Sequence, residues 1–396
     1  MDFTFTDEQQ QLRDAVRRYL SQEYAFEARK KIIHGAGVSP ETWSGFAELG
    51  LLGVPVPEAQ GGFGANGVDL LVVMEEMGRG LVVEPYFATA VLGAALVRFG
   101  GGAQADGLLP KVADGSLKLA AALTEKQSRH ELFNVATSAK PGAAGYVING
   151  AKTVVLHGAQ ADKLIVSART INANAGDLRD PSGITLFVID KDAAGVKIED
   201  YRTIDGMRAA DVTFTNVAAG HDAVLGRPGE GYAVIERAAE VGIAALAAEA
   251  VGAMQALQDA TIEYLKTRKQ FGVPIGKFQV LQHRAAECFM EIEQARSLAY
   301  LAAVKVDSPD ATERARAIHA AKVRVGRALK FVGQAAVQMH GGMGMTDELN
   351  VGHYFKRLTM IEATLGDTDH HLAAFAALGS AAGAGQSAAR AALKAA

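Results

Sequence analysis

Cysteine, net charge and long apolar runs are what this 396-residue sequence has least of. The single cysteine, Cys288, excludes an internal disulfide and a thiolate metal cluster, and it fits a buried side chain in a reducing compartment. A formal net charge of −4 gives no electrostatic basis for binding nucleic acid or an anionic membrane. No uninterrupted apolar run reaches the ~18 residues of a membrane-spanning helix. We therefore expect neither a nucleic-acid partner nor a membrane anchor.

The first residues, MDFTFTDEQQ, also lack the basic and apolar regions of a secretory signal peptide, so we expect a cytoplasmic protein. What the sequence does have is a globular composition, with 49% hydrophobic and 21% charged residues. Its length favours two or three domains over a single core.

The N-terminal part of the chain has helical patterns. Thr6 and Gln9 have the spacing of a capping box ahead of an apolar stripe that begins at Leu12. Further helices are predicted over 40–50 and 68–78.

Between those two helices, Gly62, Gly64 and Gly67 have the spacing of a dinucleotide-binding turn. That turn must follow a strand, and Pro55 and Pro57 do not fit one. We interpret the glycines as an ordinary loop.

The region from 119 to 225 consists of short runs rich in valine, isoleucine, threonine and phenylalanine, which predict strands. Asn149 and Gly150 tolerate positive φ and predict a tight hairpin turn between two of these runs. The polar segment 170–183 predicts a loop. The predicted strands cover 146–148, 152–155, 164–168, 184–189 and 212–214.

After Gly231 three long segments with few helix breakers, at 233–265, 279–304 and 312–338, predict antiparallel helices of a bundle. We place a helical N-terminal domain at 1–118, a β domain at 119–227, a helical bundle at 228–380 and an Ala/Gly-rich tail at 381–396.

Two segments of the bundle could hold a ligand. Arg268 lies where a long helix ends, close to Phe271, and an arginine with an aromatic ring can grip a phosphate and cover a planar group. The glycines at 341–344 follow another helix and leave backbone amides open to an anion. For Arg268 an ordinary helix end is the commoner explanation, and a simple helix stop also explains the glycines, so neither pattern is decisive alone.

Other kinds of site have little support. The adjacent His370 and His371 lack the spacing that puts two metal ligands on one helical face, so we expect no metal. Cys288 lies within a predicted helix, and no nucleophile elbow is present, so hydrolase chemistry is not expected.

Taken together, several motifs resemble the acyl-CoA dehydrogenase family over nearly the whole chain. They are RKQFG at 268–272, the PIxxFQxxQ spacing at 274–282, QMHGGMG at 338–344, NGxK at 149–152, the Ile204 to Arg208 stretch, GLLGVPVPEAQGGFG at 50–64 and EEMGRG at 75–80.

This resemblance implies an α+β multidomain fold with a helical N-terminal domain, a β-barrel or sandwich middle domain and a C-terminal four-helix bundle. It further implies dimers or tetramers around noncovalent FAD and the α,β-dehydrogenation of an acyl-CoA thioester. In that reaction a carboxylate removes the α-proton, a hydride leaves the β-carbon for the flavin, and hydrogen bonds stabilise the charge on the thioester oxygen.

The resemblance also assigns FAD contacts. Seven residues would reach the pyrophosphate and adenine side of FAD in a neighbouring subunit: Arg268, Phe271, Phe278, Gln279, Gln338, Gly341 and Gly342. Thr368 lies where the family has a threonine against the flavin, and His370 stands where a glutamine is usual.

The departures concern the catalytic base. The usual glutamate position is Gly366, and the alternative position on the first bundle helix is Gly242. Asp367 and Glu240 are the nearest carboxylates, although either is equally an ordinary surface residue.

The middle domain departs as well. The loop over the flavin has changed to Thr124-Glu125-Lys126 followed by Gln127-Ser128-Arg129-His130, and Val154-Val155-Leu156 replaces Trp-Ile-Thr. The half of the cofactor site that a subunit uses itself is therefore eroded.

The half that a subunit lends to its neighbour is retained, which favours a heteromer with a larger homologous subunit that supplies the base. LHG at 156–158 and the segment 353–372 also resemble small subunits of dehydrogenases for pimeloyl-CoA and for steroid side-chain thioesters. The alternatives are a self-sufficient homomeric dehydrogenase or flavin oxidase that uses Asp367 or Glu240, and a non-catalytic scaffold subunit.

Overall fold

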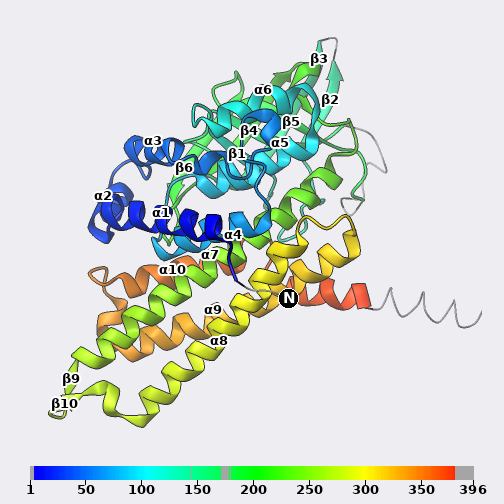
Figure 1. Cartoon of the computed structure of the whole chain (residues 1–396). Coiled ribbons are helices and arrows are strands. Elements are labelled where there is room, and N and C mark those ends of the chain that lie inside the picture. Colours follow the sequence, from blue (N-terminus) through cyan, green and yellow to red (C-terminus); the bar gives the residue numbers. More distant parts are fainter. Residues whose placement is uncertain (1–3, 143, 171–177, 179, 380–396) are drawn as a thin grey trace, which may run out of the picture.

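The computed structural model describes residues 4–142, 144–170, 178 and 180–379. The chain forms a helical N-terminal part, a middle β-sheet and a C-terminal helical bundle, in that order (Figure 1). This architecture confirms the predicted α+β fold. The tail at 381–396 and most of the loop at 170–183 lie outside the described residues.

The N-terminal part is built from helices whose ends follow local sequence signals. The predicted capping box is present, because the Thr6 hydroxyl accepts a hydrogen bond from the Gln9 amide and the Gln9 side chain accepts one from the Thr6 amide. No strand precedes the turn at 62–67 among the described residues, in agreement with a loop. The helices are α1 (Asp7–Glu23), α2 (Phe26–His34), α3 (Pro40–Glu48), α4 (Gly67–Arg79), the π-helical η3 (Phe87–Gly93), α5 (Ala94–Gly100) and α6 (Gly102–Ala113).

The middle part is an eight-stranded mixed sheet in the order β6-β7-β3-β2-β4-β5-β8, with β1 parallel to β4. Its core is packed with branched and aromatic side chains such as Ile148, Val166 and Phe187. The strands are β1 (Leu119–Ala122), β2 (Ser138–Gly142), β3 (Gly145–Leu156), β4 (Lys163–Arg169), β5 (Ile184–Asp190), β6 (Val196–Arg202), β7 (Arg208–Ala219) and β8 (Val224–Leu225).

The predicted hairpin turn at Asn149-Gly150 is wrong. Both residues lie inside β3, which continues through them because it pairs with β2 on one side and β7 on the other. The register with β7 shifts between Ile148 and Gly150, and Gly150 has a φ of 151°. A Cβ there would come within 2.5 Å of the Thr137 hydroxyl, so the glycine serves a bulge in a continuous strand.

The C-terminal part is a bundle of α7 (Gly231–Thr267), α8 (Gln279–Lys305), α9 (Ala311–His340) and α10 (Asn350–Ala363), as expected. α7 is its central helix and packs against α4, α8, α9 and α10. Glycines let α4 and α7 approach closely, because a Cβ on Gly78 would lie 1.9 Å from the Glu249 carbonyl oxygen and one on Gly252 would lie 1.8 Å from that of Glu75.

A buried ion network also joins the bundle to the middle domain. Arg357 of α10 donates to Glu249 of α7 at 2.5 and 2.8 Å and to Asp205 of the middle domain at 2.9 Å. These contacts orient the bundle relative to the sheet.

Helix α7 is long and apolar enough to cross a membrane by length and composition. However, 89% of its most apolar 18-residue window is buried inside the protein. We therefore interpret α7 as the core helix of the bundle.

Candidate functional site

The end of α7 lies at the tip of the bundle, far from the β-sheet, where Figure 1 labels β9 and β10. Arg268 directly follows the last residue of α7. The Arg268 amide donates to the Tyr264 carbonyl at 2.8 Å and closes the helix. Beyond it, β9 (Lys269–Gln270) and β10 (Val273–Pro274) form a short antiparallel ribbon. Phe271, at the turn of that ribbon, is 92% exposed. The Arg268 side chain is exposed and has no ion pair within the described part of the chain.

The other predicted FAD contacts of the bundle lie on the ends of α8 and α9. Phe278 precedes the first turn of α8, and Gln279 begins it. Gln338 is exposed in the last turn of α9. A Cβ on Gly341 or Gly342 would meet nothing within 4 Å, and Gly341 has a φ of 59°. This turn leaves its backbone open to a bound group.

A stacked ring pair brings the two segments together. The rings of Tyr264 and His340 lie 4.3 Å apart between centroids at an angle of 27°. Tyr264 is four residues before Arg268, and His340 is next to Gly341. The structure therefore gathers these sequence-predicted contacts at one end of the bundle.

The predicted base positions lie elsewhere, beside a cavity of about 780 Å³ between the middle domain and the bundle. At a rise of about 1.5 Å per residue, α7 places Gly242 roughly 40 Å from Arg268. The two regions are therefore well separated within one chain. The cavity lining is mostly apolar and includes Phe87, Leu92, Ala121, Leu123, Val154, Leu156, Met360, Leu365, Gly366 and Asp367.

At Gly242 apolar side chains fill the space that a side chain would need. A Cβ there would lie 2.8 Å from Leu365 Cδ1 and 3.6 Å from atoms of Leu92 and Phe87. A glutamate at 242 would have to displace Leu365 and bury its carboxylate among these groups.

At Gly366 two imidazoles occupy the corresponding space. A Cβ there would lie 2.5 Å from His371 Nε2 and 2.7 Å from His370 Cδ2, and the φ of Gly366 is 101°. A side chain at 366 would thus meet both imidazoles on a strained backbone, whereas one at 242 would require the end of Leu365 to move.

Asp367 lines the 780 Å³ cavity, but it is engaged in other contacts. Its carboxylate accepts the His370 amide at 2.8 Å and lies 3.3 Å from His130 Nε2. The hydrogen bond from the His370 backbone holds the pKa of Asp367 below its usual range, with a further contribution from His130. A lowered pKa makes this carboxylate a weaker proton acceptor.

Glu240 belongs to a different cavity, of about 570 Å³, and does not line the larger one. Its carboxylate lies 3.1 Å from Arg237 and 2.9 Å from Arg314. The two candidate bases are thus not brought together.

Thr368 and His370 face away from the larger cavity. The Thr368 hydroxyl donates to Glu362 at 3.0 Å and is buried, and neither residue is part of the lining of the 780 Å³ cavity. His370 lines the smaller cavity and lies 3.7 Å from Glu131. Their role as flavin contacts stays a prediction.

Reasoning from the sequence missed a cluster of histidines at this junction. His130 and Glu131 of the middle domain pair with Asp367 and His370, as described above. His371 Nε2 donates to the Leu365 carbonyl at 2.8 Å, so its Nδ1 accepts from His319 Nδ1 at 2.8 Å. Burial lowers the pKa of His371 to about 3, which keeps the ring neutral. No sequence signal joins residues so far apart in the chain.

The altered loop at 124–130 is fixed by a buried ion pair. Lys152 Nζ donates to Glu125 at 2.7 Å, and Glu125 also accepts the amides of Ala136 and Thr137. Burial lowers the pKa of Lys152 to about 8 despite this carboxylate. Burial alone would raise the pKa of Glu125, but Lys152 and the hydrogen bonds hold it below its usual value. Both groups therefore stabilise the domain and are not free for catalysis.

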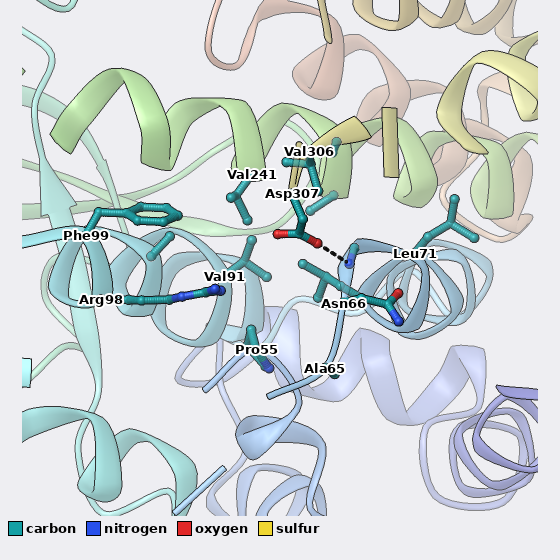
Figure 2. Close-up of a pocket in the computed structure, with 15 residues that line it drawn as sticks. Pro55, Ala65, Asn66, Leu71, Val91, Arg98, Phe99, Val241, Val306 and Asp307 are labelled. Atoms are coloured by element: carbon teal, nitrogen blue, oxygen red, sulfur yellow. Dashed lines mark hydrogen bonds between the residues drawn. The ribbon is translucent and has the colours of Figure 1, made fainter. Parts of the chain in front are cut away.

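Two further regions of the described residues offer no additional site. The described residues contain no group of three or more histidine, cysteine, aspartate or glutamate side chains that could hold a metal ion. A cavity of about 30 Å³ lies between the N-terminal helices and α7, where Asp307 accepts the Gly67 amide at 2.9 Å (Figure 2). It has room for little more than a water molecule.

The groups at the end of the bundle suit part of an FAD molecule. The bundle end combines a free guanidinium, an exposed aromatic ring and open amides, which suit a pyrophosphate and a planar ring. In the 780 Å³ cavity Val154 and Leu156 offer no hydrogen-bonding side chain, but other lining residues do: Thr124, Lys126, Arg129, His130, Thr153 and Thr364.

Comparisons with known proteins agree with this fold. Three family models match: the acyl-CoA dehydrogenase N-terminal domain at 6–116, middle domain at 120–217 and C-terminal domain at 229–378. The chain is 32% identical over 360 residues to acyl-CoA dehydrogenase FadE12 of Mycobacterium tuberculosis, covering 88% of this chain and 90% of that protein.

Solved structures agree too. A structure named Tcur3481-Tcur3483 steroid ACAD G363A variant is 29% identical with a TM-score of 0.85, covering 96% of this chain and 99% of that one. The glutaryl-coenzyme A dehydrogenase glutaryl-CoA complex is 26% identical with a TM-score of 0.86, covering 95% and 96%.

Proposed function

Because this chain belongs to the acyl-CoA dehydrogenase family of FAD-dependent oxidoreductases acting on CH–CH bonds, we propose that it serves that reaction as the base-lacking subunit of a heteromer. A homologous larger subunit supplies the carboxylate, and this chain completes the FAD site of that partner. The observation that carries the proposal is that both usual base positions are glycine, so this chain supplies no carboxylate at either, and neighbouring side chains occupy the adjoining space.

The lent half of the site is a set of binding groups. When bound, FAD supplies the hydride acceptor for the β-carbon of the thioester. Arg268 can donate charge-assisted hydrogen bonds to the pyrophosphate, and the open amides at 341–342 can donate further ones to the same anion. Phe271 can cover a planar ring. These groups bind and orient, and none of them moves a proton.

The roughly 40 Å between Arg268 and Gly242 along α7 supports the need for a second subunit. Because the lent residues cannot reach the cavity of their own chain, they act only in an assembly. A homologous partner would present a cavity of its own to them. The structure named for both Tcur3481 and Tcur3483, described as a steroid ACAD, supports a two-chain assembly and makes a steroid thioester one candidate substrate.

The self-sufficient alternative has one observation in its favour, since Asp367 lines the 780 Å³ cavity. Its lowered pKa and its contact with His130 count against it, because a general base must be free to accept a proton at a matched pKa. We therefore favour the heteromer.

The test is the FAD content of the chain co-purified with its homologous partner. Arg268→Ala should release FAD, whereas Lys266→Ala, an exposed residue in the last turn of α7, should not. Loss of one charge-assisted hydrogen bond, about 1.5–3 kcal/mol, corresponds to a roughly 10-fold to 150-fold weaker affinity. Equal flavin content in both variants would refute the lending role.

A further inference from the structure

We propose that Tyr264 and His340 are positioning residues, whose stacked rings hold Arg268 and the Gly341–Gly342 turn in the relative placement that one bound FAD requires. The inference rests on the proposed function, in which both segments serve the cofactor of a partner. The proposed function does not explain what fixes the position of Arg268 relative to the Gly341–Gly342 turn, and the stacked rings do.

The stacked pair lies next to both lent segments. The Tyr264 carbonyl accepts the Arg268 amide at 2.8 Å, so the conformation of Tyr264 sets where Arg268 leaves the helix. His340 is the last residue of α9 and is bonded directly to Gly341. The ring centroids are 4.3 Å apart, and the Tyr264 hydroxyl lies 3.5 Å from the His340 carbonyl oxygen. A shift of either ring would therefore move one segment relative to the other.

The orientation of His340 is itself fixed. Its Nδ1 donates to the Ala336 carbonyl at 2.8 Å within the last turn of α9, and the side chain is buried. The glycine turn folds back over it, since a Cβ on Gly344 would lie 3.1 Å from His340 Cβ and 2.8 Å from the Val337 carbonyl oxygen. His340 thus packs against the glycine turn, and its ring stacks on Tyr264 of α7.

The ribbon after α7 holds the Arg268 backbone, because the Ile275 amide donates to the Arg268 carbonyl at 2.9 Å, but this contact does not tie Arg268 to the turn at 341–342. Arg268 and Phe271 are exposed, and side chains at 341 and 342 would meet nothing. A ligand that contacts both segments binds well only if their separation is fixed before it arrives, since any ordering on binding weakens the affinity. Two flat rings in contact provide a rigid spacer with few rotatable bonds.

The experiment measures the FAD dissociation constant of the co-purified complex by titrating its FAD-depleted form and following flavin fluorescence. His340→Leu and Tyr264→Leu remove one ring each, whereas His340→Phe and Tyr264→Phe retain both. We expect each leucine variant to weaken FAD binding by about 2-fold to 12-fold, the range for an aromatic pair. Tyr264→Phe, which loses only the 3.5 Å hydroxyl contact, should stay within about twofold of wild type, and His340→Phe, which keeps the ring but loses the hydrogen bond to Ala336, should bind FAD more tightly than His340→Leu.

A double variant separates positioning from general damage. If the rings act through each other, Tyr264→Leu combined with His340→Leu should be no weaker than the worse single variant. Losses that multiply in the double variant would overturn the proposal. Should His340→Leu fail to assemble, His340→Gln, which retains a donor but has no ring, decides in its place.

Arg268→Ala, measured in parallel, distinguishes the two ways to fail. If Arg268→Ala leaves FAD binding unchanged, the lending function is wrong and the positioning inference falls with it. If Arg268→Ala weakens binding while every ring-removing variant stays within about twofold of wild type, the proposed function stands and only the positioning inference is overturned.

Discussion

Alanine substitution in the glycine turn after α9 separates folding from cofactor binding. Gly341 has a φ of 59°, so Gly341→Ala should reduce the free energy of unfolding of the chain by about 1–2 kcal/mol. Gly342 has no positive φ, and a Cβ there meets nothing within 4 Å, so Gly342→Ala should change it by less than about 0.5 kcal/mol.

In the co-purified complex the two variants should behave alike. A methyl group at either position keeps a phosphate from approaching the backbone, and the loss of one such hydrogen bond weakens FAD affinity by roughly 10-fold to 150-fold. Denaturant unfolding of the chain and FAD titration of the complex give the two quantities. Gly107→Ala, at an open position of α6, is the control that should leave FAD binding unchanged. If Gly342→Ala bound FAD as well as this control does, the turn would not be a cofactor contact.

Three further predictions concern stability, measured by denaturant unfolding. Lys152→Met should lower the free energy of unfolding by about 3–5 kcal/mol, because it leaves the Glu125 carboxylate buried without its cation. A decrease below about 1 kcal/mol would contradict the buried ion pair. Stability should fall as the pH drops from about 6.5 towards 4, since burial lowers the pKa of His157 to about 4 and of His371 to about 3 while the unfolded rings bind protons near 6.5. His157 alone should contribute about 3 kcal/mol of that loss, and a flat profile would show that these rings are not buried in neutral form. Gly366→Ala should lower the free energy of unfolding by more than about 1 kcal/mol, because the φ of residue 366 is 101° and the added Cβ would lie 2.5 Å from His371 Nε2. An unchanged midpoint of denaturant unfolding would show that the turn adapts without strain.

Local signals in the sequence were sufficient for much of the fold. The capping box at Thr6 and the long helices of the bundle follow from interactions between residues close in sequence. The error at Asn149-Gly150 has the opposite cause. The dipeptide suits a hairpin, but hydrogen bonds to β2 and β7 on both sides keep the strand continuous. Strand β6 was also missed, because four of its seven residues, Lys197, Glu199, Asp200 and Arg202, are charged and hide the strand pattern.

The candidate site shows the same division. The sequence predicted that Gly242 and Gly366 lack a carboxylate, since that requires only the residue identity. It could not predict that Leu365 fills the space beside Gly242 or that His370 and His371 fill the space beside Gly366. The contact with Leu365 depends on how α7 packs against the turn after α10. The contacts with His370 and His371 depend on the backbone conformation at Gly366. The Tyr264–His340 stack likewise joins two helix ends that only the packed bundle brings together.

The most direct test of the account compares the isolated chain with the chain co-purified with its homologous partner. Flavin absorbance per protein and the bleaching of that absorbance by acyl-CoA thioesters are measured for both. The account predicts that the isolated chain gives no bleaching with any thioester, and that the complex is bleached only while the base of the partner is intact. The account would be contradicted if the isolated chain contained as much flavin as the complex and showed full bleaching and turnover with an acyl-CoA thioester.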